Sequence, residues 1–339
     1  MKVSSEHAQR GAAPPWERVS FLTSDTIRNH ARFQEAHDCF VDELLALYGG
    51  DRRLIRGLVE YVRAVTFMII ICLDAVRDPD DPATDVTLAR LRAALAPMGI
   101  TDGRRIAELV NGFELDGFLT REVSPTDRRA HVLRPTEKML ATDREWLATF
   151  HAPLALLYPD EPAYQAAMAR DPAYQVAYRR VSLSTIGFAE RIISSNPPIG
   201  FFLSHDVGIR VLMVLVAAVR GKTPPRAPRG IYTAAAERAG VSRTHVRNLM
   251  RVAADQGLLT MPNSSARHIE LLPPLQEAVT RWIADSLSGV DLVCTLAKAH
   301  LGHHCVLGRT RSAQPLGLMT GTNPQKTEIW TPLRSTLES

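Results

Sequence analysis

The sequence predicts a mainly α-helical protein that carries small β wings. Three observations lead to this prediction. Apolar residues recur at helical spacing over most of the 339 residues, a helix-turn-helix pattern followed by a short strand occupies 231–260, and a weaker copy of that pattern lies earlier in the chain. We therefore expect two helical units, each with one wing, joined and flanked by long helices.

The composition is that of an ordinary globular protein. Hydrophobic residues make up 45% of the chain and charged residues 22%, and 339 residues are enough to bury the cores of two domains. The net charge of +4 is small, so affinity for nucleic acid has to come from local basic patches. The four cysteines have no framework spacing, and two apolar runs are too short to span a bilayer. These features favour a cytoplasmic protein.

The helix-turn-helix pattern is clearest between Ile231 and Thr260. Ala236 lets two helices approach each other, and Gly240 supplies the left-handed turn between them. Ser242 is a good N-cap for the second helix, and Gly257 ends that helix. Four apolar side chains of this helix recur at helical spacing and should face inward: Val246, Leu249, Met250 and Ala253.

The opposite face of the same helix is polar and basic. A helix of this kind, placed in a major groove, is the recognition helix of a winged helix-turn-helix. The wing that follows should have strands near Leu258–Met261 and His268–Leu271, with Arg267 beside its tip as a cation for the DNA backbone. The residues of the helix that we expect at DNA are Ser242, Arg243, Thr244, His245, Arg247, Asn248 and Arg251.

A weaker copy of the pattern begins near Gly99. The tripeptide Gly99-Ile100-Thr101 corresponds to the later turn Gly-Val-Ser, with one extra residue. Gly117 precedes Phe-Leu-Thr just as Gly257 precedes Leu-Leu-Thr, 140 positions later. We interpret the similarity as an internal duplication of one unit. The alternative is a chance similarity between two helical hairpins.

The first copy has a less basic recognition helix, expected over 102–116. Glu108, Glu114 and Asp116 would repel phosphate. Two interpretations stay open: only the N-terminal turn of this helix contacts DNA, or this copy has a structural role. The side chains that could face a groove are Arg104, Arg105 and Asn111.

The wing of the first copy carries a distinctive motif. Residues 117–142 read GFLTREVSPTDRRAHVLRPTEKMLAT, with Asp127 and Arg129 as an Asp-x-Arg element and Thr136-Glu137-Lys138 as a helix start. This segment resembles the wing of MarR-family transcription regulators, and the resemblance extends over roughly residues 55–150. It implies that Arg129 reaches the DNA minor groove and that Asp127 orients basic side chains. The neighbouring Arg128 is a further expected wing contact.

The sequence departs from the MarR pattern at two positions of the helix start. Pro135 stands where the family usually has leucine, and Met139 stands where it has glycine. MarR-type regulators are dimers whose wings flank a helical dimerisation domain. The resemblance therefore implies that two units in one chain could form a pseudo-dimer, although a homodimer of two chains is the other expectation.

The domain boundaries follow from these patterns. We expect a flexible N-terminal segment at 1–23, a first winged-helix unit with flanking helices at 24–158, a helical linker at 159–200, a second winged-helix unit with a terminal helix at 201–300, and a disordered tail at 301–339. Within the linker, Pro162 and Pro172 each follow an acidic residue, which is typical of a helix start.

Motifs of catalysis and cofactor binding are missing from the sequence. It contains no Walker loop, dinucleotide fingerprint, Gly-x-Ser-x-Gly elbow or His-Glu-x-x-His element, and the histidine-rich run at 300–305 fits no standard zinc spacing. We therefore expect no enzyme activity, no cofactor and no metal site.

The predicted function is a sequence-specific DNA-binding transcriptional regulator, a bacterial repressor associated with the nucleoid. Its expected partner is double-stranded DNA, and a small-molecule effector stays open. Two alternatives remain. A plasmid-type replication initiator also carries paired winged helices, and winged helices that lose their basic face can act as a protein-interaction scaffold.

Overall fold

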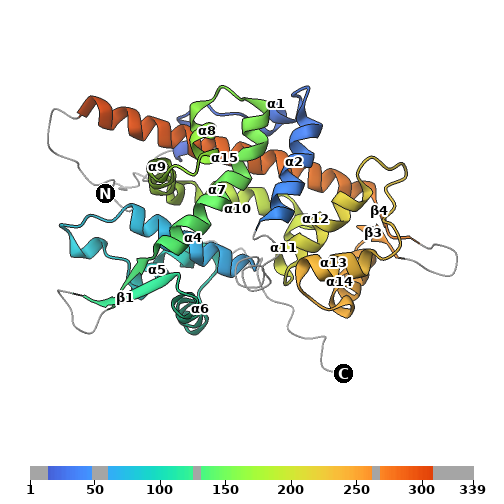
Figure 1. Ribbon diagram of the computed structural model, residues 1–339, viewed down its shortest axis with the longest axis horizontal. Coiled ribbons are helices and arrows are strands. Elements are labelled where there is room, and N and C mark those ends of the chain that lie inside the picture. Colours follow the sequence, from blue (N-terminus) through green and yellow to red (C-terminus); the bar gives the residue numbers. More distant parts are fainter. Residues whose placement is uncertain (1–13, 48–59, 125–130, 262–267, 308–339) are drawn as a thin grey trace, which may run out of the picture.

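The computed structural model describes residues 14–47, 60–124, 131–261 and 268–307, with the backbone alone at 300–307. Within these ranges the chain is mainly helical and contains two small antiparallel sheets of two strands each, as Figure 1 shows. The predicted combination of a mainly α fold with small β elements is thereby confirmed.

Two segments of the chain repeat the same order of elements: three helices, two strands and a long helix. The first repeat consists of α4 (Tyr61–Ala75), α5 (Leu88–Leu95), α6 (Gly103–Leu115), β1 (Leu119–Val123), β2 (His131–Pro135) and α7 (Glu137–Leu157). The second repeat consists of α12 (Gly208–Val219), α13 (Ile231–Ala239), α14 (Arg243–Asp255), β3 (Leu259–Thr260), β4 (Glu270–Leu271) and α15 (Pro273–Leu307).

The backbone hydrogen bonds at the end of α6 and α14 are the same in both repeats. The N–H of Phe118 donates to the carbonyl of Phe113 at 2.8 Å, and the N–H of Leu258 donates to that of Ala253 at 3.0 Å. Each bond spans a glycine with positive φ, +74° at Gly117 and +69° at Gly257, the conformation for which glycine is favoured. Both glycines were predicted as helix ends from the sequence.

The two sheets are also built alike. An isolated bridge adds a third short stretch to each: Thr87 pairs with Val132 of β2, and Arg226 pairs with Glu270 of β4. In both repeats this stretch precedes the second helix of the three. The repeat therefore extends beyond the helices to the sheet and its connections.

The segment predicted as a helical linker is made of short helices packed in the core. It forms the helices α8 (Pro162–Met168), α9 (Pro172–Ser182), α10 (Ile186–Ser194) and α11 (Pro197–Ser204). Tyr164, Ile199 and Phe202 from these helices are buried in the larger hydrophobic core. As predicted, Pro162 and Pro172 stand at helix starts, where the carboxylates of the preceding Glu161 and Asp171 cap the backbone.

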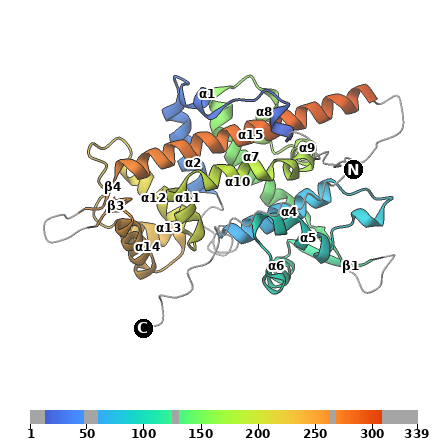
Figure 2. The same cartoon turned by 180° about the vertical axis from the view of Figure 1, so that it is seen from behind.

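The larger core unites elements that are far apart in sequence. The N-terminal helices belong to it: α1 (Ser24–Arg28) packs beside α15, and α2 (Phe33–Ala46) packs beside α7 and α12. A smaller core lies under α4, α5, α6 and the first sheet. The long helix α15 extends along the upper side of the molecule in Figures 1 and 2 and contacts α7, so the two helices that follow the sheets meet.

The N-terminal prediction needs a correction. Residues 1–23 were expected to be flexible, but the described part, from 14 onward, packs against α10 and α15. The Trp16 ring centroid lies 6.1 Å from that of Phe188, and the N–H of Leu22 donates to Asp291 at 2.6 Å. Aromatic packing and a charge-assisted hydrogen bond therefore hold this segment.

The predicted start of the disordered tail also needs a correction. The helix α15 continues to Leu307, past the expected boundary at 301, and no proline interrupts it there. Residues 308–339 lie outside the described ranges. Within the described part of the chain, no helix combines the length and apolar character needed to cross a membrane.

Candidate nucleic-acid interface

Helix α14 has one buried and one exposed face, as its sequence predicts. Ser242 caps the helix, its Oγ accepting the N–H of His245 at 3.1 Å. The inward side chains Val246, Leu249, Met250 and Ala253 are all buried. This burial fixes the rotation of the helix about its axis, so the opposite face must point to solvent.

The exposed face of α14 carries a stripe of three arginines. Arg243, Arg247 and Arg251 lie four residues apart, so they project on one side of the helix. All three are exposed, and none of them forms an ion pair within the described ranges of the chain. The polar side chains of Thr244 and Asn248 are exposed beside them. This face has free hydrogen-bond donors and positive charge, and helix α14 itself lies at the lower right of the molecule in Figure 1.

His245 has a different role from the one predicted. Its imidazole Nε2 lies 3.1 Å from the carbonyl oxygen of Asp206, which can only accept, so this nitrogen carries the proton and donates. Asp206 belongs to the turn that leads into α12. His245 therefore anchors the start of α14 to the protein instead of offering this nitrogen to DNA.

The predicted DNA contacts on α6 are engaged with the protein. Nε of Arg104 donates to Glu108 at 3.0 Å, and Arg105 pairs with Glu60. The amide oxygen of Asn111 accepts a hydrogen bond from Arg121. All three predicted residues are exposed, but each cation has a carboxylate beside it. The arginines of α6 are thus paired with carboxylates, one of which, Glu60, lies outside the helix. The arginine stripe of α14 has no such partner in the described ranges.

The residues predicted as wing contacts fall on two stretches of the chain. Asp127, Arg128 and Arg129 belong to 125–130, and Arg267 belongs to 262–267, and both stretches lie outside the described residues. The strands on either side of these two stretches are within the described ranges. β1 pairs with β2 from Leu119–Pro135 to Val123–His131, and β3 pairs with β4 through Leu259–Leu271 and Thr260–Glu270.

The sequence interpretation missed two contacts in the second repeat. The Tyr232 ring lies under the guanidinium of Arg247, with 5.7 Å between Cζ and the ring centroid. Arg226 donates to Glu270 of β4 at 2.9 Å and so joins the stretch before α13 to the second sheet. Tyr232 is an aromatic residue in the first turn of α13, so the sequence could have indicated its contact with Arg247. The second contact joins residues 44 positions apart and has no local signal.

A buried arginine positions the second repeat in the molecule. Arg210 of α12 is 5% exposed and its Nε donates to the carbonyl of Arg238 at the end of α13, at 2.7 Å. Its Nη2 donates to the carbonyl of Leu45 at 2.9 Å. The guanidinium therefore satisfies helix-end carbonyls of α13 and α2 at once. It joins the N-terminal helices to the unit that carries the arginine stripe.

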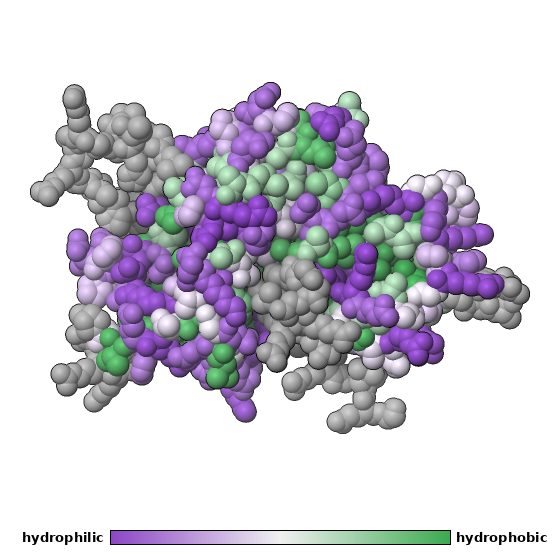
Figure 3. Space-filling view, viewed as in Figure 1, coloured by the Kyte–Doolittle hydropathy of each residue, from purple (hydrophilic) through white to green (hydrophobic). Residues whose placement is uncertain are grey.

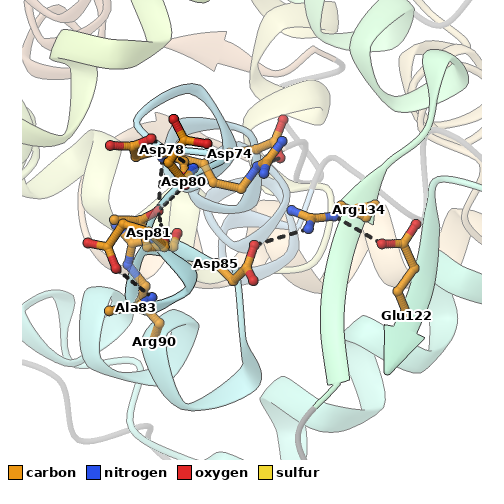
Figure 4. Close-up of polar contacts among 11 residues, drawn as sticks. Asp74, Asp78, Asp80, Asp81, Ala83, Asp85, Arg90, Glu122 and Arg134 are labelled. Carbon is orange, nitrogen blue, oxygen red and sulfur yellow. Dashed lines mark hydrogen bonds and ion pairs between the residues drawn. The ribbon is translucent and has the colours of Figure 1, made fainter. Parts of the chain in front are cut away.

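Carboxylates gather between α4 and α5, as Figure 4 shows. Asp78 accepts the N–H of Asp80 at 3.0 Å, and Asp81 accepts that of Ala83 at 3.0 Å, so these carboxylates cap turns. Asp85 accepts from Arg134 of β2 at 3.0 Å, which fixes the base of the first sheet. In the described part of the chain no group of three His, Cys, Asp or Glu is arranged to hold a metal ion.

An open cavity of about 490 Å³ separates the start of α4 from the end of α11. One wall contains Glu60, which pairs with Arg63 at 3.0 Å and with Arg105 of α6. The other wall contains Asp206, whose carbonyl accepts from His245 of α14. The cavity is therefore next to residues that hold the starts of both candidate recognition helices.

Both candidate recognition helices lie along the same edge of the molecule. Helix α6 lies left of the centre and α14 lies right of it on the lower side in Figure 1, and both remain on the lower side in Figure 2. In Figure 3 much of the visible surface near this edge is hydrophilic.

Comparisons with known proteins give no relative. No family model matches the chain, and no curated protein or solved structure matches it. The likeness to the MarR wing therefore depends on the motif in the sequence alone.

Proposed function

We propose that this protein binds double-stranded DNA sequence-specifically and regulates transcription, as a bacterial repressor. In this proposal α13, α14 and the sheet of β3 and β4 act as a winged helix-turn-helix, with α14 in the major groove. The observation that carries the proposal is the exposed arginine stripe of α14. Its three cations have no acidic partner among the described residues, while the opposite face of the helix is buried.

The chemistry of arginine supports this assignment. The planar guanidinium donates two parallel hydrogen bonds to O6 and N7 of guanine, a contact that distinguishes this base from the others. Four residues of helix rise about 6 Å, so neighbouring arginines of the stripe can reach successive base pairs or the flanking phosphates. Thr244 and Asn248, exposed on the same face, add neutral donors and acceptors.

The first repeat would contribute less to DNA binding than the second. Exposed ion pairs such as Arg104–Glu108 are weak, so phosphate can compete for the arginine. Each exchange, however, leaves an uncompensated carboxylate close to a phosphate, and like charges repel. We therefore propose an asymmetric DNA site with one strong and one weak half.

The same repeat suggests how the two units are arranged. Two units in one chain, with α7 and α15 in contact, have the parts of a dimer already joined. We propose that a single chain acts as a pseudo-dimer on DNA. The alternative, a homodimer that pairs its strong units across a palindrome, predicts a symmetric site.

Selection of bound sequences from a random duplex pool tests the proposed function. We expect enrichment of one motif with an asymmetric pair of half-sites. No enrichment at low salt would contradict DNA recognition, and a perfect palindrome would contradict the pseudo-dimer. Mapping the motif to promoters or to a replication origin separates a regulator from a replication initiator.

One observation favours a different role for the first repeat. Leu115 at the end of α6 is 89% exposed and Val123 of β1 is 58% exposed, beside the ion pairs of that face. Exposed apolar side chains among neutralised charges suit contact with a protein better than contact with phosphate. The matching test is Leu115→Asp, which should leave affinity for the selected duplex unchanged if this face does not touch DNA.

A further inference from the structure

Tyr232 connects the arginine stripe to the second sheet. It lies in the first turn of α13, with its ring half-buried under α14. The guanidinium carbon of Arg247 is 5.7 Å from the ring centroid. The phenol hydroxyl donates to the Met261 sulfur at 3.6 Å, just after β3. One side chain thus contacts both the recognition helix and the base of the wing.

A ring under a guanidinium restricts the motion of the cation. The negative face of the aromatic system attracts the cation within about 6 Å of the centroid. An exposed arginine otherwise samples many rotamers, and this freedom is lost when it binds a base. Contact with a ring leaves donors of the guanidinium available for hydrogen bonds. The contact should therefore order Arg247 without occupying all of its donors.

The other two arginines of the stripe lack this support. Within the described residues, no aromatic ring lies under Arg243 or Arg251. The three cations are consequently unequal before any ligand arrives: the middle one is held and the outer two are free to move. A held side chain discriminates between bases better than a mobile one, because its donors keep a fixed direction.

We propose that Tyr232 is a positioning residue that sets the base preference of Arg247. The proposal depends on the proposed function, since it assigns a role within DNA recognition. It places the most discriminating contact of the site at Arg247 and leaves Arg243 and Arg251 as contacts that tolerate more sequences.

The test uses the full chain and the duplex selected by the wild type. Affinity is measured on this duplex and on one with the base pair opposite Arg247 exchanged. We expect Tyr232→Leu to lower affinity for the selected duplex about two- to fivefold, the strength of one exposed cation–π contact, and to leave the exchanged duplex nearly unaffected. Tyr232→Phe keeps the ring and should stay within about twofold of the wild type.

Double variants separate positioning from a general effect on the fold. In an Arg247→Ala background, Tyr232→Leu should cause no further loss of affinity. In the matched Arg243→Ala background its effect should persist in full, because Arg243 does not contact the ring. A loss that persists without Arg247, or that is equal on both duplexes, would overturn the proposal.

A measurement without DNA keeps the inference separate from the proposed function. NMR of the free protein should show the Arg247 side-chain protons shifted upfield by the ring, and Tyr232→Leu should abolish the shift. Unshifted Arg247 protons in the wild type overturn the inference alone. Failure of the wild type to bind any duplex overturns the proposed function, whatever the NMR result.

Discussion

Arg247 of α14 and Arg104 of α6 are both exposed arginines, one in each repeat, but their surroundings differ. Arg247 has a ring beside it and no acidic partner in the described ranges, whereas Arg104 donates to Glu108. On the preferred duplex, Arg247→Ala should cost about 1–3 kcal/mol of binding free energy and relax the base preference. The matched variant Arg104→Ala should cost less than about 0.5 kcal/mol. Fluorescence anisotropy measures both, and equal losses on specific and random DNA for Arg247→Ala would contradict its place in the groove.

The buried side chain of His151 makes the stability of the folded protein depend on pH. Its Nδ1 lies 2.7 Å from the carbonyl of Leu147, and its Nε2 lies 2.7 Å from the Tyr174 hydroxyl. Burial lowers the pKa of His151 from 6.5 to about 4, so the ring is neutral in the folded protein.

The sign of the pH effect follows from this pKa. Between pH 6.5 and 4 the unfolded chain binds a proton at His151 that the folded protein does not, so stability falls as the pH falls. One such group contributes at most about 1.4 kcal/mol per pH unit. Urea unfolding at several pH values should give His151→Gln a shallower dependence than the wild type over this window. Parallel curves would show that His151 does not titrate as described.

Residue-level predictions from the sequence succeeded where the signal was local. Ser242 as an N-cap and the inward set of α14 follow from spacing along one helix, and the structure has them so. The pairing of Arg105 with Glu60 joins positions 45 apart, and the contact of His245 with Asp206 joins positions 39 apart. Such contacts depend on tertiary packing, so helical periodicity could not indicate them.

At the scale of elements, two glycines allow a matched pair of substitutions. Gly257 ends α14 with φ of +69°, and Gly112 lies inside α6; an added Cβ would meet no atom within 4 Å at either position. Alanine at these two positions should therefore differ in its effect on stability only through the backbone conformation. Gly257→Ala should lower the free energy of unfolding by about 1 kcal/mol, because alanine is strained at positive φ. Gly112→Ala should raise it by roughly 0.5–1 kcal/mol.

Thermal or chemical unfolding measures this pair. The two changes should have opposite signs, with circular dichroism showing unchanged helix content. Destabilisation by both alanines to the same extent would mean that the turn after α14 does not need its left-handed conformation.

Element boundaries were predictable where caps and breakers mark them. Thr136, Pro162, Pro172 and Gly257 all mark helix ends that the structure contains. The break between α1 and α2 and the packing of 14–23 were not predictable. The packing of 14–23 depends on the surfaces of α10 and α15, which are remote in sequence.

At the scale of the whole molecule, the number of chains bound to one duplex tests whether the two repeats act as a pseudo-dimer. A pseudo-dimer should bind one selected duplex as a single chain, since α6 and α14 of one molecule lie along the same edge. Light scattering of the complex should therefore give a mass of one chain plus one duplex. A stable complex of two chains on one duplex would favour the homodimer.

The most direct test of the central claim, that the arginine stripe of α14 binds duplex DNA, is the salt dependence of binding. Each phosphate contact releases counterions, so the logarithm of the binding constant should fall linearly with the logarithm of the salt concentration. The triple variant Arg243→Ala, Arg247→Ala and Arg251→Ala should bind weakly and with a shallower slope, while Arg104→Ala and Arg105→Ala together should change the slope little. A flat dependence in the wild type, or no binding at low salt, would contradict the account.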